Sequence, residues 1–325
     1  MQSAGVNSNS SNNFILNDSW SSTQKIILLQ ILVGFFLYIN CLMIFTFLKK
    51  EVFREETRYI LFAQTLFVDS AFILLADLLS LGTYFQFPIN MGICSICVLI
   101  QNFFICCTAL TLLAMCLERY VAICMPLRHA EISTSRTISY GFFIIWSISS
   151  IIPAFSFIGF WAEAPTNTLF SSAVCNAEVM LIKEWQAHSR AVIYVMLFLF
   201  TVIIIVFTYI KIMIAARAAS TEKMNSTNKS MRTVLLHGVQ LFLCMMQFFT
   251  PYIEMAFYKV ETMALRNIKY FNLIFFLFLP RSLSPLVYGL RDENFFHVLR
   301  HYALCGTDRL FSASREIKQL KIKPI

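Results

Sequence analysis

Ionisable side chains interrupt the most apolar stretches of this sequence and are its first candidates for chemistry. Asp69 and Asp77 lie in one such stretch, Glu254 in a second and Arg281 in a third. Charged groups in apolar surroundings are costly, so they usually pair with one another, line an ion pathway or serve a switch. Asp77 and Glu254 stand near enough to the ends of their stretches for contact with water to be an equal alternative. We expect Asp69 and Arg281 to point into a helical bundle.

No residue set typical of an enzyme or a metal site accompanies these charges. The 10 Cys are spread along the chain, and Cys94-x-x-Cys97 is the single CxxC, without the second pair that zinc-like spacing requires. No Ser/His/Asp set converges either. The sequence therefore predicts a protein that is not an enzyme and that carries no cofactor and no metal.

The composition identifies the elements that must position these residues. Hydrophobic residues make up 58% of the 325 residues and charged residues 14%, and Phe occurs 33 times. A soluble domain carries roughly 25% charged residues, and one of this size would leave a large apolar surface exposed. The chain is therefore predicted to be an all-α integral membrane protein.

Seven stretches have the length of about 20 residues that a helix needs to cross a bilayer. We place these spans approximately at Ile26–Leu48, Tyr59–Leu81, Ile93–Leu117, Ile138–Phe160, Ala191–Ile210, Val234–Phe257 and Tyr270–Leu290.

Orientation follows from the basic residues of the connecting segments, because cytoplasmic loops carry an excess of Lys and Arg. With the N-terminus outside, the inside segments carry 18 basic residues and the outside segments 6. This predicts an extracellular tail over residues 1–25, a seven-span domain over 26–290 and a cytoplasmic segment over 291–325. Sequons beginning at Asn9 and Asn17 are then candidate glycosylation sites.

A local motif at the end of the third span narrows the class. Residues 115–129 read MCLERYVAICMPLRH, which closely resembles the M-A-x-D-R-Y-V-A-I-C-x-P-L-x-Y pattern of olfactory receptors within the rhodopsin-like G-protein-coupled receptors. Asp69 lies 29 residues after Asn40, close to the family's spacing, and Trp146 occupies the span-4 tryptophan position. Residues 284–288, SPLVY, resemble N-P-x-x-Y with Ser in place of Asn.

The resemblance covers about residues 26–305, and its character is that of fish-type odorant receptors. It implies a multi-pass plasma-membrane protein whose partners are a small-molecule odorant, a heterotrimeric G protein with an olfactory-type Gα, and the lipid bilayer, with no role for nucleic acid. Two departures point to a divergent branch. Glu118 replaces the commoner Asp, and the second outside loop has one cysteine where mammalian relatives usually have three.

The family's cysteine at the top of span 3 corresponds to Cys94, which lies 25 residues before Arg119. Its expected disulfide partner is Cys175 in the second outside loop, since cysteines facing each other outside the cell are oxidised. Cys97 lies one turn deeper and is the competing partner. The bond would hold the second outside loop over the ligand pocket.

The resemblance places the ligand in a crevice among the outer halves of spans 3, 5, 6 and 7. Amine receptors of the superfamily carry Asp where Gln101 stands, so a small uncharged or weakly polar odorant is expected. Plain helix packing is an equal alternative for the aromatic residues. The candidate ligand-binding residues are Gln101, Asn102, Ile105, Cys106, Tyr194, Phe198, Phe248, Tyr252, Ile274 and Phe278.

The same resemblance assigns G-protein coupling to the inner ends of the spans. The residues of this switch are Glu118, Arg119, Tyr120, Tyr209 and Tyr288. Glu118 is expected to hold Arg119 in the inactive state, because no acid stands at the start of span 6 to form a lock between spans 3 and 6.

Asp69 and Arg281 are predicted to form a buried pair. Many rhodopsin-like receptors bind sodium at the span-2 aspartate, and Thr108 is placed to supply a span-3 oxygen. Arg281 lies four residues before Pro285 on the turn that faces this cavity, and its guanidinium would repel a cation and needs an anion itself. The alternative is that Arg281 reaches water or a helix carbonyl.

Residues 291–305 show apolar side chains at helical spacing, Phe295, Leu299 and Tyr302, opposite a charged face. This pattern predicts an amphipathic eighth helix on the inner leaflet. Cys305 at its end is a candidate palmitoylation site, with an unmodified thiol as the alternative.

Two rival functions stay open at this point. One is a receptor of the same superfamily for an internal peptide or lipid. The other is a transporter or channel that uses Asp69, Asp77 and Arg281 as a pathway, although the chain lacks the internal repeats and broken-helix glycine clusters of transporters.

Overall fold

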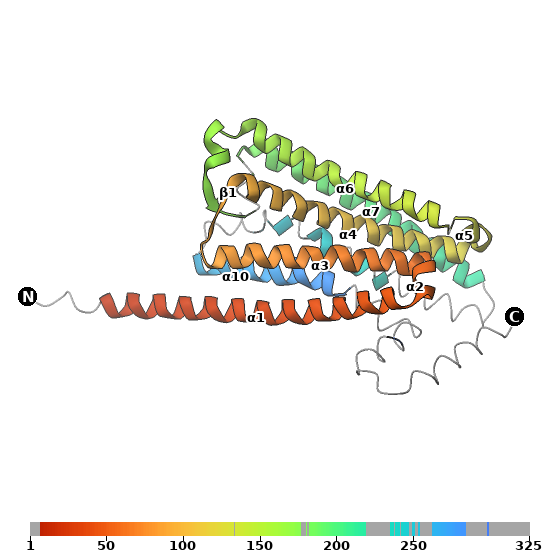
Figure 1. The fold of residues 1–325 in the computed structure, drawn as a ribbon, viewed down its shortest axis with the longest axis horizontal. Helices are drawn as coiled ribbons and strands as arrows, with labels where there is room; N and C mark the ends of the chain where they lie inside the picture. The colour runs from red at the N-terminus through yellow and green to blue at the C-terminus, as the bar shows by residue number, and fades with distance from the viewer. Residues whose placement is uncertain are drawn as a thin grey trace, which may run out of the picture.

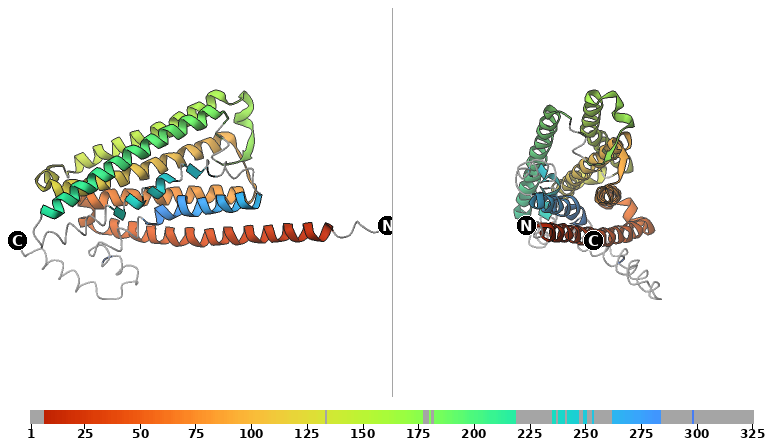
Figure 2. Two further views of the ribbon diagram at one scale, coloured as in Figure 1. Left: turned by 180° about the vertical axis from the view of Figure 1, so that it is seen from behind. Right: turned by 90° about the vertical axis from the view of Figure 1, so that its left-hand side faces the viewer.

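The computed structural model describes residues 7–132, 134–176, 180, 182–218, 235–236, 238–240, 242–246, 249–250, 253, 262–283 and 298. The side chains of residues 7–21, 130–132, 135, 216–218, 262–264 and 266 are not described. Over these residues the chain forms an elongated bundle of long helices that run side by side (Figure 1). In Figure 2 the end-on view shows the helices grouped around α4, which contacts α3, α6 and α7.

Among the residues that the structure describes, five helices are long and apolar enough to cross a membrane. They are α1 (Asn7–Lys49), α3 (Thr57–Tyr84), α4 (Met91–Cys124), α6 (Ser135–Glu163) and α7 (Glu184–Ala218). Each contains one of the first five predicted spans, which confirms those predictions. Helix is the expected conformation because a backbone in lipid must satisfy its polar groups within the segment.

The last two predicted spans are described in part. Short helical pieces between residues 235 and 246 fall in the sixth span. The seventh contains α10 (Thr262–Asn272), which passes into a π-helical turn, η4 (Leu273–Phe278), and continues as α-helix to Leu283. Tyr270 of α10 donates a hydrogen bond to the carbonyl of Lys25 in α1 (3.0 Å), which fixes these two helices beside each other.

Burial differs strongly between the helices and shows which of them face lipid. In the most apolar stretch of α3, 67% of the residues are buried inside the bundle, against 17% in α7. α6 and α7 carry many exposed large apolar side chains, among them Phe143, Ile158, Met196 and Ile203. A water-facing surface of this kind would aggregate, so these faces are the ones that contact the bilayer.

The described helices extend beyond the predicted spans at both ends, because polar residues continue a helix outside the hydrocarbon region. α1 already begins at Asn7, inside the predicted tail. α7 begins at Glu184, seven residues before the predicted Ala191. The predicted eighth helix lies outside the described residues except for Val298, which packs against the inner core cluster around Phe53 and Tyr59.

Short elements that the sequence analysis did not anticipate close the two ends of the bundle. At one end lie α2 (Glu51–Glu55) and α5 (Pro126–Ile132). At the other, β1 (Pro88–Asn90) pairs antiparallel with β2 (Ser172–Val174), and η1 (Thr166–Phe170) precedes β2 (Figure 1). The strand pair brings the segment between α6 and α7 onto the start of α4.

Candidate functional site

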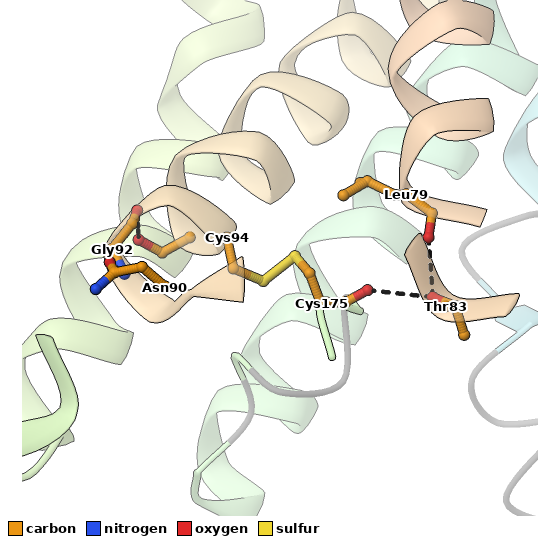
Figure 3. Close-up of a disulfide and its surroundings, with 7 residues drawn as sticks. Leu79, Thr83, Asn90, Gly92, Cys94 and Cys175 are labelled. Atoms are coloured by element: carbon orange, nitrogen blue, oxygen red, sulfur yellow. Dashed lines mark hydrogen bonds between the residues drawn. A yellow bond between two sulfur atoms is a disulfide. The ribbon is translucent and has the colours of Figure 1, made fainter. Parts of the chain in front are cut away.

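A disulfide between Cys94 and Cys175 anchors the strand-pair end of the bundle (Figure 3). The two Cα atoms are 5.5 Å apart, and both residues are buried. Thr83 at the end of α3 donates a hydrogen bond to the carbonyl of Cys175 (3.5 Å). Cys97, the competing partner, is a free cysteine. The predicted pairing is therefore confirmed, and the segment after α6 is fastened to both α3 and α4.

Asn90 adds a second attachment at this end. Its side-chain oxygen accepts a hydrogen bond from the amide of Gly92 (2.8 Å), which caps the start of α4. Its side-chain nitrogen donates to the carbonyl of Leu169 in η1 (2.8 Å). One asparagine thus caps the central helix and holds the loop above it.

The middle of the bundle contains the two buried charges that the sequence singled out. The Nε of Arg281 lies 3.8 Å from the Oδ1 of Asp69, and both side chains are fully inaccessible to solvent. Thr108 of α4 donates a hydrogen bond to the same carboxylate oxygen (2.8 Å). The structure thus brings together the three residues that were expected to share this cavity.

Arg281 has two further contacts that compensate for its burial. Its Nη1 donates a hydrogen bond to the carbonyl of Leu277 (2.7 Å), one helical turn earlier. Its guanidinium carbon lies 3.5 Å above the centre of the Phe72 ring, a cation–π arrangement. The carboxylate and the helix carbonyl, which the sequence offered as alternatives, therefore both contact Arg281.

The opposite end of α4 carries the charged pair of the motif. The Nε of Arg119 lies 3.5 Å from the Oε2 of Glu118, as the resemblance implied. The other carboxylate oxygen of Glu118 lies 3.4 Å from the Nε2 of His129 in α5, and the Glu118 side chain is only 10% exposed. His129 was not among the site residues expected from the sequence, although it occupies the motif position at which the family carries Tyr.

Two aromatic residues of the expected switch meet where α4 and α7 pack together. Tyr120 and Tyr209 both contact the buried pair Cys116 and Ile212. Tyr288, the remaining member of the expected switch, lies outside the described residues.

The candidate ligand-binding residues fall into separate surroundings. Ile105 and Phe278 lie together in an apolar cluster that includes α1 and α3. Cys106 contacts Tyr194 of α7 in a different cluster. Gln101 and Ile274 are half-buried, whereas Phe248 and Tyr252 lie outside the described residues.

Phe198 belongs to a third location, an apolar groove between α7 and residues 235–245. Its ring centre lies 6.3 Å from that of Phe242. Tyr209 lines the inner part of the same groove, and Gly238 lines the opposite wall. Val202 and Val239 are exposed on its rim, so the groove opens toward the bilayer rather than toward the bundle interior.

Asn102 lies in a different cavity, below the disulfide and between α4, α6 and α7. This cavity of about 20 Å³ is the size of one water molecule. Its lining includes a charged residue that the sequence analysis left out, Arg190 in the second turn of α7. The signal was present in the sequence, but the predicted span began one residue later, at Ala191.

The structure does not describe the side chains at the predicted glycosylation and palmitoylation sites. The asparagines of the two sequons lie within α1, in the part whose side chains are not described, and Cys305 lies outside the described residues.

Comparisons with known proteins agree with this arrangement. Residues 39–288 match the family described as "7 transmembrane receptor (rhodopsin family)". The chain is also 50% identical over 301 residues to the Odorant receptor 131-2 of Danio rerio, an alignment that covers 92% of each protein.

Proposed function

The chain belongs to the rhodopsin family of seven-transmembrane receptors, and from that premise we propose that it binds a small-molecule odorant and activates a heterotrimeric G protein. A member of this family is a multi-pass plasma-membrane receptor and not an enzyme. The observation that carries the odorant assignment is the 50% identity to an odorant receptor across 92% of both chains. An olfactory-type Gα is the expected partner.

The two functional ends lie on opposite sides of the membrane in this proposal. Cys94 and Arg119 are 25 residues apart on α4, which corresponds to about 37 Å of helix at 1.5 Å per residue. The odorant binds in the outer half of the bundle, below the loop that the disulfide holds. The G protein binds at the end that carries Glu118 and Arg119.

Signalling then requires two arrangements of the bundle between which the odorant discriminates. A ligand shifts such an equilibrium only by its difference in affinity for the two states. In the arrangement described, Glu118 contacts both Arg119 and His129. We assign this cluster to the inactive state, in which it restrains Arg119 and ties α5 to the end of α4.

We further propose that the N-terminus lies outside the cell. The outer end is then the one with the disulfide and the strand pair, and α2 and α5 face the cytoplasm (Figure 1). The excess of basic residues in the segments on the α2 and α5 side supports this orientation.

The burial of Asp69 and Arg281 speaks against the rival transporter or channel. Charged residues that line an ion pathway need contact with water, whereas both side chains here are fully inaccessible and lie against each other.

The proposal is tested in cells that carry an olfactory-type Gα and a cyclic-AMP reporter, with a panel of odorants, peptides and lipids. We expect a dose-dependent response to at least one odorant class. Arg119→Ala is expected to abolish it, whereas Arg54→Ala, which removes an exposed arginine of α2, keeps it. A response to peptides or lipids alone, at verified surface density, would contradict the odorant assignment.

A further inference from the structure

Arg190 is a charged side chain inside a membrane-spanning helix, and it lines the small cavity between α4, α6 and α7. The cavity wall also contains Asn102 of α4, Ser156 of α6, and Trp185 and Gln186 of α7. Asn102 lies eight residues after Cys94, which is about 12 Å along the helix. The cavity thus extends from Val98 and Met180, which pack against the disulfide, down to Asn102, and Arg190 reaches it from the second turn of α7.

No acidic side chain among the described residues neutralises Arg190. Glu163, at the nearby end of α6, is engaged with Lys183 (2.8 Å). Glu184 is exposed in the first turn of α7. Over the part of the chain that the structure describes, neither an ion pair nor a hydrogen bond reaches the Arg190 guanidinium. Its positive charge is therefore available to a ligand.

Some polar side chains beside Arg190 already form hydrogen bonds within the protein, and others are free to bond a ligand. The Oε1 of Gln186 accepts hydrogen bonds from the amides of Ile182 (2.9 Å) and Lys183 (3.2 Å), and its Nε2 donates to the carbonyl of Gly159 (2.8 Å). Gln186 is thus used to join α6 and α7. The side chains of Asn102 and Ser156 have no such bond to any described residue, so their donors remain open to the cavity.

We propose that this cavity binds the carboxylate group of an acidic odorant, with Arg190 as the anchor; the proposal rests on the function given above. A carboxylate matches the planar guanidinium through two parallel hydrogen bonds, and the Asn102 amide and the Ser156 hydroxyl supply further donors. In the arrangement described the cavity has room for about one water molecule, so a carboxylate enters it only once the partly exposed Trp185 on its wall moves aside. A single cation suits a single negative charge. Val98 and Phe155, which line the same cavity, offer apolar contacts to the rest of the ligand.

This inference changes the ligand class expected from the sequence. The absence of an acid at Gln101 argued against an amine and left an uncharged odorant as the expectation. Arg190 lines the same cavity as Asn102, one of the predicted crevice residues, and it strengthens the case against amines because it repels a cation. Its charge stabilises the binding of an anion and not that of an uncharged ligand.

The experiment compares hexanoate with methyl hexanoate and hexylamine, which share one chain length and differ in charge. Potency is measured with the cyclic-AMP reporter, and binding is measured as the thermal stabilisation of purified receptor. Hexanoate is expected to be at least about tenfold more potent than the ester, since a hydrogen bond to a charged group has this magnitude. Arg190→Gln is expected to remove that advantage, so that hexanoate and the ester become about equally potent.

Two further variants separate the site from general effects. Arg190→Lys keeps the charge without the planar fork and is expected to retain an intermediate preference for hexanoate, which also gives a result where Arg190→Gln does not reach the surface. Lys183→Gln removes a charge at the same end of α7, outside the cavity, and is expected to behave as the wild type. An equal loss in Lys183→Gln would mean that surface potential, not the cavity, attracts the acid.

The outcomes distinguish this inference from the proposed function. Equal stabilisation by hexanoate and its ester, or a preference for the acid that persists in Arg190→Gln, would overturn the carboxylate site while leaving the odorant receptor intact. Binding of hexanoate without any G-protein response would support the site and count against the signalling proposal. Stabilisation of the wild type and not of Arg190→Gln by anionic lipid, together with equal stabilisation by hexanoate and its ester, would reassign Arg190 to a lipid headgroup.

Discussion

The buried pair of Asp69 and Arg281 allows a quantitative prediction. The two charges are 3.8 Å apart and fully inaccessible to solvent. At an effective dielectric constant of about 20, their attraction is about 4 kcal/mol. Removal of one partner leaves the other charge buried without compensation, which typically costs 3–5 kcal/mol. Asp69→Asn and Arg281→Gln are each expected to destabilise the receptor by about this amount.

The assay is a double-mutant cycle on the solubilised receptor, with the free energy of unfolding as the readout. The double variant Asp69→Asn with Arg281→Gln is expected to lose clearly less than the sum of the two single variants, because the double variant leaves no unpaired charge behind. The exchange Asp69→Arg with Arg281→Asp is expected to recover part of the loss. Asp77→Asn is the matched control, since Asp77 lies on the same helix, is half-buried and accepts a hydrogen bond from Gln30. An asparagine there keeps that bond, so its cost is expected to stay below about 1 kcal/mol.

Three results would refute the reasoning about this pair. One is additivity of the two single substitutions, and a second is a cost no larger than that of Asp77→Asn. The third is a ligand affinity of the wild-type receptor that depends on sodium, because a cation bound at Asp69 is incompatible with a guanidinium in the same place.

Further predictions concern the two ends of the bundle. Cys94→Ser and Cys175→Ser are expected to reduce surface delivery equally, at a cost of roughly 2–5 kcal/mol in stability, whereas Cys97→Ser leaves delivery unchanged. A peptide map without reduction checks the pairing. A delivery defect in Cys97→Ser alone would contradict it. Arg119→Ala is expected to abolish nucleotide exchange on the G protein at wild-type surface density, and normal cyclic-AMP output from that variant would disprove its role. His129→Phe removes a contact of the restraining cluster and is expected to raise ligand-independent exchange, so an unchanged basal rate would show that the contact does not restrain the receptor.

The sequence was sufficient to locate the membrane spans. It also predicted the contacts that follow from the family pattern or from the high cost of burying an unpaired charge. The length of an apolar run is tied directly to bilayer thickness, so the first five helices were located correctly. A buried arginine needs an anion, and this requirement pointed from Arg281 to Asp69 across more than 200 residues. The cysteine spacing of the family selected Cys94 over Cys97 in the same way.

The walls of the ligand site could not be derived in this manner. With 33 Phe and 58% hydrophobic residues, nearly every helix face is apolar, so the sequence does not distinguish a face against lipid from one against another helix. Phe198 was expected inside the crevice and lies on a groove that opens toward lipid. Arg190 was missed because hydropathy assigns the polar first turns of a helix to the preceding loop, whereas α7 begins at Glu184.

The most direct test of the central claim is odorant-dependent nucleotide exchange on a purified olfactory-type G protein, with the purified receptor in lipid vesicles. The account predicts that an active odorant accelerates exchange with the wild type and not with Arg119→Ala, and that the same vesicles show no odorant-dependent ion flux. Ion flux without nucleotide exchange, in vesicles that contain folded receptor, would contradict it.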